Sequence, residues 1–118
     1  MNKEYKQPWI DALRSGNFKQ GRNKLESQGK YCCLGVLCEV MQIPKIEKDE
    51  EALVSVGVKK AKPYSEYEYE GDKFKEYFPE GLRNKVSLSC EDMDYLVEMN
   101  DESKCSFEHI AEYIEDNF

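Results

Sequence analysis

The sequence predicts a single α+β domain spanning residues 1–118, mainly helical, with a small antiparallel hairpin or sheet. Three observations support this prediction. The chain has 118 residues, the size of one ordinary domain. Hydrophobic residues make up 40% of it, which is enough to build a packed core. Apolar residues recur with helical spacing near both ends, whereas the middle contains short runs in which apolar and polar residues alternate.

Two helices are expected in the first third of the chain. One covers residues 7–15, because Pro8 suits the first helical position and Gly16 suits a C-terminal cap. The other covers residues 31–41, which are apolar nearly all round, so this helix should be the most buried element and should end before the next proline. Gly35 lies within this helix and predicts that another element packs closely there.

Two more helices are expected near the C-terminus, each with a serine as its N-terminal cap. Ser89 precedes the first of these helices, which should end at residues 100–101. Its apolar face is predicted to be Met93, Leu96 and Val97. Ser106 precedes the last helix, in which apolar residues recur with the helical period. These residues are Phe107, Ile110, Ala111 and Ile114.

The segments between these helices are expected to form loops and strands. Residues 17–30 should form a loop or short hairpin with a turn at Gln28-Gly29. Residues 45–51 are mostly charged and predict a solvated stretch. Residues 53–58 and 64–69 alternate in polarity and should pair with each other as a hairpin.

Aromatic residues gather in the second half of this middle region. Tyr67 and Tyr69 should fall on one face of the strand expected at residues 64–69. After a turn at residues 70–72, an aromatic cluster should precede a loop at residues 80–81. The cluster consists of Phe74, Tyr77 and Phe78.

Charge is distributed unevenly along the chain. The formal net charge is −7, yet residues 1–30 contain seven Lys or Arg and only three Asp or Glu. The last expected helix carries only acids among its charged exposed positions, namely Glu108, Glu112, Glu115 and Asp116. An acidic body of this kind repels the phosphate backbone, so we expect no binding to duplex DNA. The basic N-terminal third is instead suited to an anion or an acidic partner.

Hydropathy and cysteine content bear on the compartment. The longest apolar run is far shorter than the roughly 20 residues needed to span a bilayer, and the N-terminal residues lack the apolar core of a secretory signal. The five cysteines are an odd number and include adjacent Cys32 and Cys33, which indicates reduced, mostly buried thiols. We therefore expect no membrane association and a cytoplasmic location.

The sequence contains no arrangement that indicates catalysis, so no catalytic residue, metal or cofactor is predicted. Cys105 and His109 are spaced like two zinc ligands, which Cys32, Cys33 or Cys38 could complete. His109 could also serve as the base for a cysteine nucleophile. Because there is one histidine and no CxxC motif, packed thiols and a surface histidine are the simpler interpretation. A small hydrolase or zinc protein is therefore the third hypothesis.

The basic segment at residues 19–24 is the best candidate for a binding site. Gly21 would let backbone N–H groups face a ligand, and Arg22 offers a planar fork of donors suited to phosphate. The predicted set is Lys19, Gln20, Gly21, Arg22 and Lys24, with Tyr64, Tyr67 and Tyr69 as a second candidate surface. The alternative is a structural turn that orders the N-terminal helix against the cysteine-rich helix.

Two blocks of the sequence resemble a family of small, uncharacterised phage and prophage proteins. The first is WxxALRSGxFxQG at residues 9–21, followed by YCCLGVLC at residues 31–38. The second is MND at residues 99–101, followed by SFxxIAxxIE at residues 106–115. The resemblance implies a phage accessory protein in the cytoplasm of a host cell and carries no specific activity.

The leading hypothesis combines this resemblance with the basic segment. It is a non-enzymatic accessory protein that binds a host protein or a small anionic nucleotide signal and so counters host defence. The runner-up is a structural or regulatory domain that acts through homo-oligomer contacts. A compact pocket beside Gly21 and Arg22 would favour the first over the second.

Overall fold

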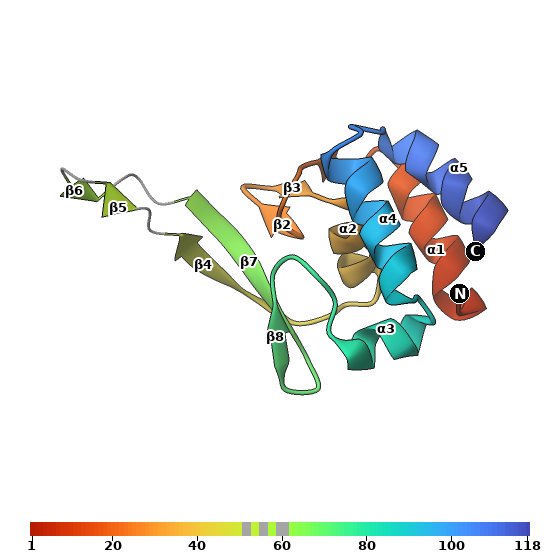
Figure 1. Cartoon of the computed structure of the whole chain (residues 1–118), viewed down its shortest axis with the longest axis horizontal. Coiled ribbons are helices and arrows are strands. Elements are labelled where there is room, and N and C mark those ends of the chain that lie inside the picture. The colour runs from red at the N-terminus through yellow and green to blue at the C-terminus, as the bar shows by residue number, and fades with distance from the viewer. Residues whose placement is uncertain (51–52, 55–56, 59–61) are drawn as a thin grey trace.

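The computed structural model describes residues 1–50, 53–54, 57–58 and 62–118 and has an α+β fold, as predicted (Figure 1). Helices gather at one end, and a β-ribbon projects from them (Figure 1). The helices within these residues are α1 (Lys3–Arg14), α2 (Cys33–Val40), α3 (Glu80–Val86), α4 (Cys90–Asp101) and α5 (Phe107–Asn117). The strands are β1 (Lys19–Gln20), β2 (Glu26–Ser27), β3 (Lys30–Tyr31), β4 (Lys45–Glu50), β5 (Leu53–Val54), β6 (Gly57–Val58), β7 (Lys62–Tyr69) and β8 (Asp72–Phe74).

Helix α1 begins earlier than the sequence predicts. Asn2 caps it, because its side chain accepts a hydrogen bond of 3.0 Å from the backbone N–H of Glu4. Pro8 therefore lies inside the helix, so the prediction that it occupies the first helical position is wrong. Its missing N–H removes one helical hydrogen bond. Gly16 follows the helix with φ +78°, the left-handed conformation expected at a C-terminal cap.

Helix α2 lies at the centre of the core, with residues 33–38 all buried. The indole N–H of Trp9 in α1 donates a hydrogen bond of 2.8 Å to the carbonyl oxygen of Cys33. Gly35 lies directly under the backbone of Leu25, and a Cβ at this position would coincide with the Leu25 carbonyl oxygen. The close packing predicted at Gly35 is therefore confirmed.

The segment at residues 17–31 forms a small sheet with strand order β1-β3-β2. Strands β2 and β3 are an antiparallel hairpin, and β1 pairs with β3 in parallel. Gln28 and Gly29 both have positive φ, at 55° and 79°, as a tight hairpin turn requires. The turn predicted there is confirmed.

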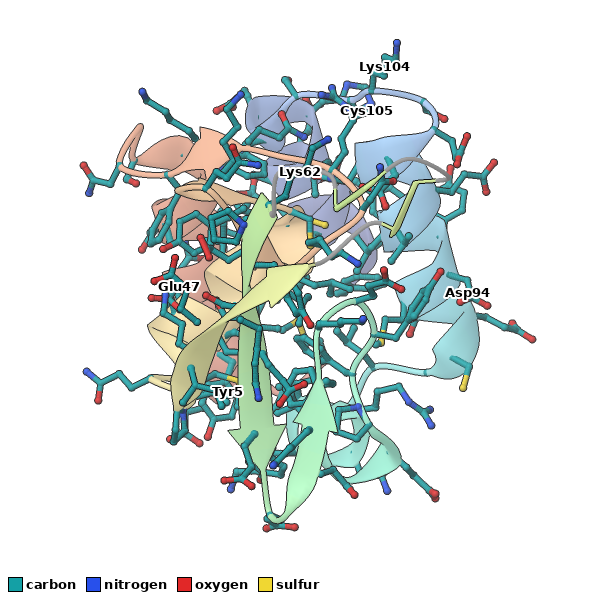
Figure 2. All side chains as sticks on the ribbon, turned by 90° about the vertical axis from the view of Figure 1, so that its left-hand side faces the viewer. Tyr5, Glu47, Lys62, Asp94, Lys104 and Cys105 are labelled. Carbon is teal, nitrogen blue, oxygen red and sulfur yellow. The ribbon has the colours of Figure 1, made fainter. Side chains whose placement is uncertain are left out.

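A second sheet, with order β4-β7-β8, forms most of the projecting ribbon. Strand β4 pairs antiparallel with β7, with Lys45 opposite Tyr67. The predicted solvated, charged stretch is confirmed for residues 45–48, which are exposed, but the sequence did not predict that residues 45–50 form a strand. Backbone pairing with β7 stabilises this strand, and its charged side chains are typical of an edge strand that must not pair with other chains. Figure 2 looks onto this ribbon, with Glu47 and Lys62 labelled.

The predicted pairing of residues 53–58 with residues 64–69 is also wrong. Residues 64–69 do form a strand, within β7, but its partner is β4. Residues 53–54 and 57–58 pair with each other as β5 and β6, and the rest of that expected hairpin lies outside the described residues. Alternating polarity indicates which side chains share a face, but it does not identify the partner strand.

Three helices follow the ribbon. Helix α3 replaces the loop expected at residues 80–81, and its Leu82 and Val86 are fully buried one turn apart. Ser89 and Ser106 cap α4 and α5 through their side-chain oxygens, as predicted. Across the described part of the chain, every helix is too short or too polar to cross a bilayer.

We expect Gly35→Ala to lower the free energy of unfolding by about 3 kcal/mol or more, because the new methyl group would overlap a backbone carbonyl that cannot easily move. Urea unfolding followed by circular dichroism measures the change. Gly81→Ala is the matched control: it lies in α3, and its Cβ would come no closer than 3.6 Å to a Glu70 side-chain oxygen. The control should leave stability unchanged or raise it by up to about 1 kcal/mol, because alanine favours the helix over glycine. Equal stability of the two variants would contradict this account of α2.

Candidate functional site

Asn100 of α4 organises the loop that contains the predicted site. Its side chain is fully buried. The Oδ1 atom accepts hydrogen bonds from Gln20 Nε2 at 2.9 Å and from the backbone N–H of Cys33 at 3.2 Å. The Nδ2 atom donates to the Gly21 carbonyl at 2.9 Å and to Asp101 Oδ1 at 2.8 Å. The amide thus uses both donors and both acceptor positions to hold the loop against α2 and α4.

Two further hydrogen bonds hold the same loop, and together with those of Asn100 we call them the Asn100 clamp. Gln20 Nε2 also donates to the carbonyl of Cys105 at 2.7 Å, and the backbone N–H of Asn23 donates to Asp101 Oδ1 at 3.1 Å. Asn23 has φ 72°, a left-handed conformation that asparagine tolerates. Gln20 and Gly21 belong to the predicted ligand-binding set. The Gln20 amide and the Gly21 carbonyl instead form hydrogen bonds within the protein.

Three cations in and beside this loop are exposed, namely Lys19, Arg22 and Lys30, and we call them the basic patch. Lys19 and Lys30 are direct partners in the β1–β3 pair, so two like charges lie side by side. Within the described ranges no ion pair joins any of the three to an acid. Lys30 was not in the predicted set; the turn at residues 28–29, which brings it back beside β1, was the signal that could have revealed it.

Two other cations of the N-terminal third, Arg14 and Lys24, are paired with acids. Arg14 Nη1 lies 2.9 Å from a carboxylate oxygen of Glu115, and Arg14 Nε lies 3.2 Å from Glu108. Lys24 Nζ lies 2.9 Å from Glu76 Oε1. Lys24 is therefore held by an acid of the fold, although the sequence grouped it with Lys19 and Arg22.

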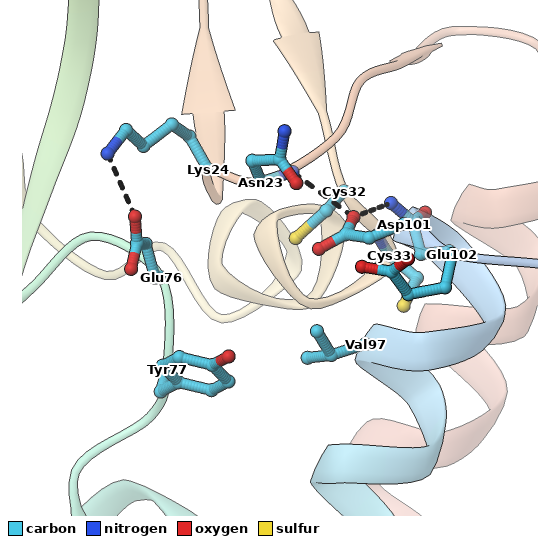
Figure 3. Close-up of a pocket in the computed structure, with 10 residues that line it drawn as sticks. Asn23, Lys24, Cys32, Cys33, Glu76, Tyr77, Val97, Asp101 and Glu102 are labelled. Atoms are coloured by element: carbon cyan, nitrogen blue, oxygen red, sulfur yellow. Dashed lines mark hydrogen bonds and ion pairs between the residues drawn. The ribbon is translucent and has the colours of Figure 1, made fainter. Parts of the chain in front are cut away.

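A pocket of about 190 Å³ lies on the Lys24 side of the loop (Figure 3). It is enclosed by the loop, by the segment that follows β8, by the start of α2 and by the last turns of α4. The lining residues are Asn23, Lys24, Cys32, Cys33, Glu76, Tyr77, Val97, Asn100, Asp101 and Glu102. Three carboxylates and one ammonium group thus face this space.

Cys32 lies at the base of the pocket with 6% of its surface exposed. Burial raises the pKa of its thiol to about 12, and the nearby Asp101 carboxylate acts in the same direction. The thiol therefore stays protonated at neutral pH, although it sits at the N-terminus of α2. A protonated thiol is a poor nucleophile, so the pocket lacks an activated cysteine.

The second predicted surface, formed by three tyrosines, is divided between two faces of β7. Tyr67 and Tyr69 share one face, and Tyr67 is fully buried, with its hydroxyl donating to a carboxylate of α2 at 2.9 Å. Burial raises the pKa of the Tyr67 hydroxyl. Tyr64 lies on the other face of β7, because side chains alternate along a strand. Its ring centre lies 5.4 Å from Lys24 Nζ and 5.2 Å from Lys75 Nζ.

The cysteines and the histidine do not converge on one site. All five cysteines are free thiols, of which Cys32, Cys33 and Cys38 are buried, Cys105 is half-buried and Cys90 is exposed. His109 is exposed on α5. In the part of the chain that the structure describes, no three His, Cys, Asp or Glu side chains form a group that could hold a metal ion.

A family model described as a domain of unknown function, DUF8296, matches residues 1–118. The chain belongs to the DUF8296 family. No curated protein and no solved structure matches it.

The Asn100 clamp of the DUF8296 fold predicts a large effect of Asn100→Ala. The change removes four hydrogen bonds and leaves buried groups of the loop and of α2 without partners, so it should cost about 3–5 kcal/mol. Hydrogen exchange at the backbone N–H groups of Cys33 and Asn23 should accelerate at the same time. Asn84→Ala, on the exposed side of α3, is the control and should cost less than about 0.5 kcal/mol. An unchanged exchange rate in Asn100→Ala would show that the loop is held by other contacts.

The cysteines of this DUF8296 protein should differ sharply in reactivity. At pH 8, iodoacetamide should modify Cys90 first, whereas Cys32, Cys33 and Cys38 should react only after unfolding. Burial both blocks access to these three thiols and raises their pKa values, so they remain protonated until the pH is strongly alkaline. Peptide mass spectrometry measures the modification at each site. Modification of Cys32 as rapid as that of Cys90 would contradict the protonation assigned here.

Proposed function

We propose that this protein is a non-enzymatic binding protein that docks an acidic surface of a partner protein on its basic patch. The observation that carries the proposal is the pair of like charges at Lys19 and Lys30, with Arg22 exposed nearby. Their mutual repulsion is unfavourable in the free protein. Carboxylates of a partner would relieve it, and the Arg22 guanidinium could hold one carboxylate with two hydrogen bonds.

The shape of this region favours a protein over a small anionic nucleotide as the ligand. A nucleotide needs a concave site that encloses most of its surface, typically about 300–1,000 Å³. The pocket at Asn23 and Lys24 is smaller, at about 190 Å³. A hollow of about 320 Å³ at the turn of residues 28–29 is lined by Glu26 and Glu47, and the basic patch lines neither space. Asp101 and Glu102 in the wall of the smaller pocket would also repel phosphate.

The biological setting of this proposal comes from the resemblance at residues 9–21 and 31–38. In a phage or prophage protein, the partner would be a protein in the cytoplasm of the host cell, and binding would block it. A homo-oligomer is the alternative partner, in which the acidic helices of a second copy meet the basic patch. Size-exclusion chromatography with light scattering distinguishes the two, because the proposal expects a monomer that binds a different protein.

The basic patch can be tested by photo-crosslinking in a bacterial extract, with a benzoylphenylalanine residue placed at the exposed position 17, next to the patch. We expect a crosslink to a discrete acidic protein. A patch variant should abolish it because its three cations are removed. The patch variant carries Lys19→Gln, Arg22→Gln and Lys30→Gln. Its matched control has the same change in net charge at exposed lysines elsewhere, namely Lys48→Gln, Lys73→Gln and Lys85→Gln.

The patch variant should fold normally, because removing exposed like charges changes stability by less than about 0.5 kcal/mol. Arg22→Lys alone should restore only part of the crosslinking, since an ammonium group lacks the planar fork. Equal loss of crosslinking in the patch variant and in the matched control would contradict a specific site. Thermal stabilisation by nucleoside triphosphates of about 2.7 kcal/mol, expected at 100 times the dissociation constant, would instead support the nucleotide hypothesis.

A further inference from the structure

The pocket shown in Figure 3 has the opposite charge to the basic patch. One of its three carboxylates, Glu76, is paired with Lys24 at 2.9 Å. Asp101 accepts two N–H groups, from Asn23 and Asn100, which fixes its position at the wall. Glu102 is exposed and makes no side-chain hydrogen bond to the described residues. The pocket therefore has a net negative charge that the described residues do not neutralise.

The remaining walls of the pocket are apolar or aromatic. Tyr77 is 55% exposed, an unusual degree for a large aromatic side chain in this protein. Val97 of α4 faces the same space (Figure 3). An exposed aromatic ring close to carboxylates is the combination that binds organic cations, because the ring face attracts positive charge.

The base of the pocket provides a second, independent observation. The Cys32 side chain is only 6% exposed, and its Sγ points into the space (Figure 3). Its thiol makes no capping hydrogen bond to α2, and its S–H has no acceptor among the described residues. A weak, polarisable donor in this position is a suitable contact for a methylene chain or a polar end group from another molecule.

We propose that this pocket accepts one cationic side chain, an arginine or a lysine, from a partner protein. Its volume of about 190 Å³ lies below the about 300–1,000 Å³ of sites for drug-sized ligands, which matches a single inserted side chain. The aliphatic stem would lie along Tyr77 and Val97, and the charged end would lie between Asp101 and Glu102. The inference goes beyond the proposed function, because it uses a separate site that recognises the opposite charge.

The test is a titration of the ¹⁵N-labelled protein with N-acetyl-arginine amide, followed by NMR. We expect saturable chemical-shift changes at the amides of Tyr77, Val97 and Glu102. N-acetyl-citrulline amide has nearly the same shape without the charge and should produce none. N-acetyl-lysine amide and N-acetyl-norleucine amide form a second pair, which determines whether the pocket distinguishes guanidinium from ammonium groups.

Two matched variants make the test specific. Glu102→Gln should weaken the binding of N-acetyl-arginine amide about three- to fivefold, as expected for the loss of one partly exposed ion pair. Glu98→Gln removes the same charge from an exposed position of α4 four residues earlier, outside the pocket, and should leave the affinity unchanged. Tyr77→Ala should also weaken binding.

Equal effects of Glu102→Gln and Glu98→Gln, or equal shifts with the arginine and citrulline probes, would overturn the proposal. Either result would mean that the probe senses only the general acidity of the protein. The basic patch variant should bind N-acetyl-arginine amide as the wild-type protein does. Failure of this proposal is therefore distinguishable from failure of the proposed function, which is measured by crosslinking at the patch.

Discussion

The backbone of Leu25 lies directly on helix α2 at Gly35, and much of the remaining structure depends on this contact. The Leu25 side chain is fully buried, its carbonyl oxygen accepts a hydrogen bond of 3.2 Å from the N–H of Cys32, and its own N–H donates to the Lys75 carbonyl at 2.8 Å. One residue thus joins the N-terminal loop, the central helix and the segment that follows β8. Only glycine at position 35 leaves room for it. The pocket exists because these three parts of the chain meet here.

Buried polar groups then fix how the helices are placed around this contact. Trp9 ties α1 to α2 through its indole N–H, and Asn100 ties α4 to both α2 and the loop. No buried side-chain nitrogen or oxygen within the described residues lacks a hydrogen-bond partner. A fully satisfied network of this kind specifies one arrangement, because any shift would leave a buried group unpaired. Both candidate surfaces are therefore held on a rigid support, which suits binding without large rearrangement.

Features marked by residues at or next to their own position could be predicted from the sequence, whereas features that depend on residues far away in the chain were missed. Gly35, the turn at residues 28–29 and the caps at Ser89 and Ser106 all have local signals, and all were confirmed. Strand β4 was missed because its stability comes from pairing with β7, which its charged residues do not reveal. The sequence indicates only that Asn100 lies at the end of a helix. Its hydrogen bonds to Gln20 and Gly21 join residues some 80 positions apart, which no local pattern could predict. Residues 19–24 were predicted as one candidate segment, and only the three-dimensional pairing separates Gln20 and Gly21, which are bonded to Asn100, from the exposed Lys19 and Arg22.

The projecting ribbon has a mechanical consequence. Strand β7 contains eight residues, so it reaches about 26 Å at about 3.3 Å per residue. Near its base, Tyr67 and Lys45 both contact the Glu39 carboxylate, at 2.9 Å and 3.0 Å, and Glu39 belongs to α2. Farther along the strand, the Ser65 hydroxyl donates to Glu26 Oε1 at 2.7 Å, and the Ser27 hydroxyl donates to the Pro63 carbonyl at 2.7 Å. Strand β7 is therefore attached to α2 near one end and to β2 nearer the other. These two attachments together set the direction in which the ribbon points, so a shift at one of them would be resisted by the other.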